Sequence, residues 1–207
     1  MIVKKKGYAI ILAAGHAARF GGNKLVAHIS SKSLIEYTLT SYLDIRNLLD
    51  GILVVINPNN TELKSILTKL DVNIIENEKS ESGGMSSSIL KALDFFKISR
   101  INPHFLFIQP GDIPKIRAED LQLLLTMHFE THSGIIIPQY NNKAGHPLLI
   151  SGKLFHDLNQ INEKTLGLRG FLANHKAEIY YSQSHNPYIL EDVDTEADFE
   201  RIFSLDT

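Results

Sequence analysis

The feature that most constrains this chain is an apolar run, Tyr8 to Leu12, that passes directly into a loop of small residues, Ala13, Ala14 and Gly15. A short continuous apolar run is typical of a strand covered on both faces of an α/β sheet, although a buried helix segment would give the same pattern. Small residues let a ligand approach the main chain, and exposed N–H groups in such a loop can hold an anion. The stretch therefore predicts a buried strand followed by an anion-binding loop.

Two cations follow the loop. Arg19 carries a planar fork that can hold two phosphate oxygens, and Lys24 carries a mobile point charge. Together with the loop they favour a polyphosphate ligand. The loop matches neither of two widespread glycine loops, because the P-loop spacing fails at Phe20 and the dinucleotide fingerprint fails at Ala17. The alternative is an ordinary glycine-rich turn with surface cations.

Composition limits the class of protein. With 207 residues, the chain is predicted to form one domain over residues 1–207 with a sizeable core. A formal net charge of -2 with dispersed cations does not indicate a nucleic-acid surface. The absence of Cys excludes a thiol nucleophile, disulfides and thiolate metal sites, and it fits a cytoplasmic location. No run approaches the roughly 18 apolar residues of a membrane span, so we expect no membrane partner.

Apolar runs and amphipathic segments alternate along the rest of the chain. Strands are predicted at residues 52–56, 72–75, 105–108, 135–138, 145–150 and 177–181. Helices are predicted at residues 33–48, 61–70, 85–93, 119–129, 153–158 and 168–175, with a last one around Phe199. Ser33 is a candidate N-cap, and Thr195 with Asp198 forms a candidate capping box. This alternation predicts a three-layer α/β fold with a mostly parallel (mixed) sheet.

Two further stretches place polar groups at the ends of elements. The first, at the predicted start of a helix, consists of Gly84, Met85, Ser86 and Ser87. Free N–H groups there can bind an anion or a base edge, although plain N-capping explains the serines equally well. The second is Asp112, which follows the strand at 105–108, where open α/β sheets bind ligands. A carboxylate facing a phosphate loop would repel the ligand unless a cation lay between them, so Asp112 indicates Mg²⁺ or, alternatively, only a turn.

Five motifs, in chain order, resemble the molybdenum cofactor cytidylyltransferase family of the MobA-like NTP transferases. They are Leu12-Ala13-Ala14-Gly15 with Arg19 and Lys24, Gly84-Met85-Ser86-Ser87-Ser88, Gly111-Asp112, Gly145-His146-Pro147, and Asp192-Val193-Asp194-Thr195. Each motif alone is weak, but five in the family's order are specific. Two positions depart from the family pattern: Ala17 replaces a small polar residue, and Thr165 stands where relatives usually have Asp.

The resemblance implies a Rossmann-like nucleotidyltransferase fold and a reaction in which an acceptor phosphate attacks the α-phosphorus of a nucleoside triphosphate and pyrophosphate leaves. It implies that the nucleotide is bound by Leu12, Ala13, Ala14, Gly15, Arg19, Lys24, Gly84, Met85, Ser86 and Ser87. It further implies that Lys24, Arg19 and Asp112 are catalytic, that Asp112 and Asp194 bind Mg²⁺ (or Mn²⁺), and that His146 and Arg169 bind the acceptor.

The resemblance also favours particular substrates. Ala14 favours CTP, because guanylyltransferases of this group usually carry Leu-Ala-Gly-Gly in the loop. The implied acceptor is the terminal phosphate of molybdopterin, and a molybdoenzyme apoprotein is a further candidate partner. Two alternatives stay open. One is the same chemistry with GTP or on another acceptor, such as a sugar or polyol phosphate. The other is a non-catalytic protein that binds nucleotide or delivers cofactor.

Overall fold

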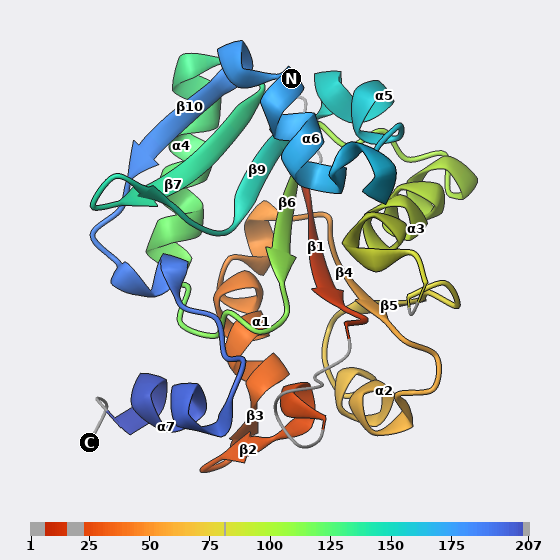
Figure 1. Cartoon of the computed structure of the whole chain (residues 1–207), viewed down its shortest axis with the longest axis vertical. Helices are drawn as coiled ribbons and strands as arrows, with labels where there is room; N and C mark the ends of the chain where they lie inside the picture. The colour runs from red at the N-terminus through yellow and green to blue at the C-terminus, as the bar shows by residue number, and fades with distance from the viewer. Residues whose placement is uncertain (1–6, 16–22, 81, 205–207) are drawn as a thin grey trace.

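A computed structural model of the chain describes residues 7–15, 23–80 and 82–204 (Figure 1). Its centre is a sheet with the strand order β10-β7-β9-β6-β1-β4-β5, in which β8 also pairs with β7. The strands of this sheet are β1 (Gly7–Ala13), β4 (Gly51–Ile56), β5 (Asn73–Glu76), β6 (Phe105–Pro110), β7 (Ile135–Tyr140), β8 (Lys143–Ala144), β9 (Leu148–Ser151) and β10 (Ile179–Gln183). Two short strands, β2 (His28–Ile29) and β3 (Lys32–Ser33), pair separately as a hairpin.

Helices cover both faces of the sheet. The α-helices are α1 (Leu34–Asp44), α2 (Thr61–Leu67), α3 (Gly84–Ile98), α4 (Ala118–Thr131), α5 (Phe155–Leu158), α6 (Gly167–Asn174) and α7 (Glu196–Ser204). Single 3₁₀ turns are η1 (Lys24–Val26), η2 (Arg46–Leu48), η3 (Gly152–Leu154), η4 (Glu163–Thr165), η5 (Lys176–Glu178) and η6 (Pro187–Leu190). No helix in the described part of the chain has the length and apolar character needed to cross a membrane.

Alternate residues of β1 enter two separate hydrophobic cores. Ala9 and Ile11 belong to a core that also contains α1, α2 and α4, while Tyr8 and Ile10 belong to a core that contains α3 and α6. A strand that is buried on both faces has no polar side, which explains why β1 reads as a continuous apolar run. The predicted three-layer α/β fold with a mostly parallel sheet is therefore confirmed.

The strand β9 runs against its neighbours. It pairs antiparallel with both β6 and β7, so the sheet is mixed, as predicted. The predicted strand at 145–150 begins only at Leu148, and β7 and β8 form a small hairpin before it. Because β9 is reversed, its first residue lies opposite Ile108, near the carboxyl end of β6. The segment before β9 therefore reaches the edge of the sheet where β1 and β6 end.

The starts of α1 and α7 agree with the predicted capping residues, whereas the end of α1 differs from the prediction. Ser33 precedes α1, and its main-chain N–H donates to Glu36 Oε2 at 2.7 Å. The α-helix ends at Asp44 and a 3₁₀ turn follows, so the prediction of one helix to residue 48 was wrong at its end. At α7, Asp198 N donates to Thr195 Oγ1 at 3.2 Å and Thr195 N donates to Asp198 Oδ2 at 3.0 Å. This capping box is confirmed.

Candidate active site

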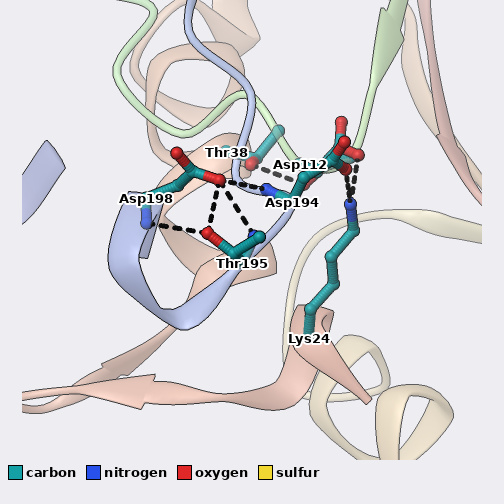
Figure 2. A network of polar contacts seen from close by, with 7 residues as sticks. Lys24, Thr38, Asp112, Asp194, Thr195 and Asp198 are labelled. Atoms are coloured by element: carbon teal, nitrogen blue, oxygen red, sulfur yellow. Dashed lines mark hydrogen bonds and ion pairs between the residues drawn. The ribbon is translucent and has the colours of Figure 1, made fainter. Parts of the chain in front are cut away.

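Three charged side chains from distant parts of the sequence meet at the carboxyl edge of the sheet (Figure 2). The Nζ atom of Lys24 lies 2.8 Å from Asp112 Oδ2 and 3.0 Å from Asp194 Oδ1. The lysine side chain is 13% exposed, against 22% for Asp112 and 43% for Asp194. One ammonium group therefore holds two carboxylates together at a partly buried position.

Main-chain contacts bring these residues to one place. Gly111 follows β6, and because β6 lies beside β1 in parallel, it lies next to the end of β1, where its N–H donates to Leu12 O at 2.9 Å. Thr38 Oγ1 in α1 donates to Gly111 O at 2.7 Å; Thr38 is labelled in Figure 2. The N–H of Val193 then donates to Asp112 O at 2.9 Å, which fixes the segment that carries Asp194. Asp194 lies just before α7 rather than at the end of a strand.

The charges at this edge influence one another. Burial lowers the pKa of Lys24, but the hydrogen bonds and charges of Asp112 and Asp194 outweigh burial and raise it overall. Lys24 is therefore a cation at neutral pH. Burial raises the pKa of Asp192, and the negative charges of Asp194 and Asp112 raise it further. The site is thus a concentration of acidic groups around one cation.

A pocket of about 410 Å³ opens beside this cluster. It is lined by Leu12, Ala14, Gly15, Ser80, Gly84, Met85, Ser88, Pro110 and Asp112. A pocket of roughly 300–1,000 Å³ is the usual size for a small-molecule site. A Cβ on Gly15 would meet no atom of the described residues within 4 Å, so these residues leave room for a ligand beside the main chain that follows β1. The small-residue loop, the start of α3 and Asp112 therefore share one cavity.

Several predicted nucleotide contacts do not line this pocket. Ala13 is buried within β1. Ser86 N donates to Glu163 Oε1 at 2.9 Å, and Ser87 Oγ donates to Gly84 O at 2.9 Å. Ser88, which the predicted set omitted, does line it, because α3 begins at Gly84 and its helical phase turns residue 88 toward the cavity. The predicted Arg19 lies outside the described residues, as does Ala17, one of the two departures from the family pattern.

The two predicted acceptor residues lie in different surroundings. The main-chain N–H of His146 donates a hydrogen bond to Ile189 O at 2.9 Å, and a Cβ on Gly145 would lie 2.6 Å from that same oxygen. Burial lowers the pKa of His146, while the nearby charge of Asp112 raises it, and lowering prevails. His146 is therefore neutral at neutral pH and lies near Asp112. Arg169 is an exposed residue of α6 and does not line the pocket.

The carboxylates fit a hard divalent cation. Asp112 Oδ2 contacts Lys24, but its Oδ1 is buried and accepts no hydrogen bond from the described residues. No group of three or more His, Cys, Asp or Glu in the described ranges is placed to hold a metal. Mg²⁺ commonly binds through one or two carboxylates together with substrate phosphates. Asp112 and Asp194 could supply two such carboxylates, and Asp112 Oδ1 accepts no hydrogen bond from the described residues.

Comparisons with known proteins agree with this geometry. A family model described as the MobA-like NTP transferase domain matches residues 9–179. A protein of Thermococcus sibiricus, named probable molybdenum cofactor guanylyltransferase, is 25% identical over 141 residues, which cover 67% of this chain. The chain spans 65% of the length of that relative.

Solved structures share the fold at low identity. A nucleotidyl transferase from Methanothermobacter thermautotroptrophicus superposes with a TM-score of 0.78 at 19% identity, covering 97% of each chain. A cytidylyltransferase from Leptospira borgpetersenii has a TM-score of 0.75 at 15% identity, covering 97% of this chain and 86% of its own. A manganese complex of Rv0371C from Mycobacterium tuberculosis has a TM-score of 0.70 at 16% identity, covering 97% and 99%. The family match shows that the chain belongs to the MobA-like NTP transferase domain family, and the solved structures share its fold.

Proposed function

We propose that the protein transfers CMP from CTP to the terminal phosphate of a molybdopterin-type acceptor and releases pyrophosphate. The observation that carries the proposal is the meeting of Lys24, Asp112 and Asp194 beside a pocket lined by an open main chain. Nucleotidyl transfer needs alignment and charge neutralisation rather than a covalent nucleophile. A cluster of this kind, next to a cavity of nucleotide size, supplies both.

The proposed roles follow from the chemistry of each group. An oxygen of the acceptor phosphate attacks the α-phosphorus in line, the bond to the bridging oxygen breaks, and pyrophosphate leaves with the electron pair. Lys24 neutralises negative charge on the transferred phosphate, and Arg19 is proposed to hold the departing pyrophosphate. Asp112 and Asp194 are proposed to hold Mg²⁺ or Mn²⁺, which supplies Lewis-acid polarisation of the phosphate oxygens when bound. His146, being neutral, would offer the acceptor a hydrogen bond rather than a charge.

The proposed preference for CTP over GTP depends on the methyl group of Ala14. Ala14 lines the pocket and is almost fully buried, so its methyl group occupies space that a glycine would leave empty. A narrower pocket favours the smaller pyrimidine, which supports CTP. GTP is the second candidate, because the matched Thermococcus relative is named as a probable guanylyltransferase. Molybdopterin as acceptor is proposed from that relative's name and from the resemblance of the five motifs.

A pyrophosphate-release assay tests the proposal. Purified protein is given molybdopterin, a sugar phosphate or a polyol phosphate, each with CTP, GTP, ATP or UTP and with Mg²⁺ or EDTA. We expect release with CTP and molybdopterin that requires the metal. Preference for GTP or for another acceptor would keep the proposed nucleotidyl transfer and change the proposed substrates. Triphosphate binding without release under every condition would support the non-catalytic alternative.

Two variants test the metal assignment. Asp112→Asn and Asp194→Asn keep the size of each side chain and remove its charge, so each should abolish metal-dependent turnover while leaving the fold intact. Asp94→Asn is the matched control, since Asp94 is exposed on α3 and pairs with neighbouring Lys97. Turnover at the wild-type rate in either site variant would remove the assignment.

A further inference from the structure

One contact near the pocket is not explained by the roles proposed above. Glu163 in η4 accepts a hydrogen bond through Oε1 from the main-chain N–H of Ser86, at 2.9 Å. Ser86 lies in the first turn of α3, where N–H groups have no acceptor within the helix. The hydrogen-bonding contact with Ser86 lowers the pKa of Glu163, so its carboxylate is charged at neutral pH. A carboxylate of the chain itself thus occupies the anion position at the start of α3.

The contact is shaped from both sides. Gly84 has φ +56°, and a Cβ there would lie 2.8 Å from Glu163 Cδ. Gly167 has φ +53°, and a Cβ there would lie 2.6 Å from Ser86 Oγ. Both glycines adopt left-handed conformations that strain other residues, and both lack the atom that would push the two segments apart. The start of α3 and the turn from η4 into α6 therefore pack directly on each other.

In the proposed reaction, the start of α3 borders the nucleotide and the turn from η4 into α6 borders the acceptor. Gly84, Met85 and Ser88 form one wall of the nucleotide pocket. Glu163 lies a few residues before Arg169, the proposed acceptor contact on α6. Glu163 itself does not line the pocket. The hydrogen bond between its carboxylate and Ser86 instead joins the nucleotide wall to the acceptor segment.

We propose that Glu163 is a positioning residue, which fixes the start of α3 and so holds the nucleotide wall and the acceptor segment in one arrangement. This inference rests on the proposed function. Because Glu163 acts before chemistry, its loss should weaken the binding of both substrates and leave the chemical step intact. It also means that the triphosphate is bound by the loop after β1 and by Lys24, since the Ser86 N–H is already occupied.

Three variants test the role. In Glu163→Ala we expect KM to rise about tenfold for the triphosphate and for the acceptor, which corresponds to about 1.4 kcal/mol, with kcat within about twofold of wild type. Glu163→Gln keeps an oxygen acceptor for Ser86 and should recover most of the loss. Glu119→Ala is the matched control, because Glu119 is an exposed carboxylate in the first turn of α4, and it should change neither constant.

Amide hydrogen exchange gives a readout that needs no turnover. The Ser86 N–H should be protected in wild type and in Glu163→Gln, and should exchange faster in Glu163→Ala. Equal exchange in wild type and Glu163→Ala would overturn the proposal. So would faster exchange with unchanged KM values, a fall in kcat alone, or an effect on one substrate only. If wild type turns over no acceptor, the proposed function fails separately, and triphosphate dissociation constants of the same variants then decide the positioning role.

Discussion

Replacing Lys24 by Ala removes the one cation that the described structure places between Asp112 and Asp194. Both carboxylate oxygens contact the same nitrogen, at 2.8 and 3.0 Å, so they lie within about 6 Å of each other. Two unit charges at that separation repel by roughly 3 kcal/mol at an effective dielectric constant of about 20. Asp194 is 43% exposed, so solvent screening reduces the repulsion. We expect Lys24→Ala to lower the free energy of unfolding by about 2 kcal/mol without metal.

Thermal unfolding in EDTA and in saturating MgCl₂ measures this effect. A loss of about 2 kcal/mol corresponds to a fall in Tm of about 4–8 °C for a chain of this length. Mg²⁺ should restore most of that loss in Lys24→Ala, because the ion can take the place of the ammonium group between the carboxylates. In wild type the stabilisation by Mg²⁺ should be smaller, since the lysine already neutralises the pair.

The control is Lys64→Ala, which removes a surface ion pair with Glu76 at 2.6 Å. Both of those side chains are well exposed, so the change should stay within about 0.5 kcal/mol and should not respond to Mg²⁺. The reasoning fails if Lys24→Ala melts at the wild-type temperature in EDTA. It also fails if Mg²⁺ raises the Tm of wild type and Lys24→Ala equally.

Three further changes test the core and the periphery. Tyr42→Phe removes the buried hydrogen bond that Tyr42 Oη donates to Gln109 Oε1 at 2.6 Å. It should lower the free energy of unfolding in urea by about 1–2 kcal/mol, and an unchanged urea midpoint would contradict this. Asp120→Ala leaves two buried hydrogen-bond donors without their acceptor and should cost roughly 2–4 kcal/mol by the same measurement. The hydrogen bond to Phe171 O and the contact with Asp157 raise the pKa of His175, so its stabilising contribution is full below its unfolded pKa and is lost as pH rises through the folded value. The Tm difference between wild type and Asp157→Asn should therefore shrink from about pH 5.5 to about pH 8.5, and a difference that grows would refute it.

The parallel part of the fold could be read from the sequence because its signals are local. The runs that became β1, β4 and β6 are apolar throughout, since helices cover both of their faces. Capping residues such as Ser33 and Thr195 act within three positions and were read correctly. The direction of β9 was not readable, because a short apolar run looks the same whichever way it pairs.

The sequence predicted only those residues of the candidate site that belong to recognisable motifs. Lys24, Asp112 and Asp194 were brought together by the resemblance of their motifs, and the structure places them in contact across 88 and 170 residues. Glu163 was missed because it meets Ser86 across 77 residues and no local pattern marks the pair. The role of Arg19 and the extent of one domain over residues 1–207 stay predictions.

The reversed strand β9 separates two groups of residues that meet at the same edge of the sheet. The loop after β1 and the Gly111-Asp112 turn come from parallel strands, whereas the Gly145-His146-Pro147 segment reaches the same edge by entering a strand that runs the other way. The segment that leads into β9 can therefore be remodelled without moving the parallel strands that carry the loop after β1. A chimaera that exchanges residues 141–147 with those of a relative should keep its triphosphate and change only what receives the nucleotide.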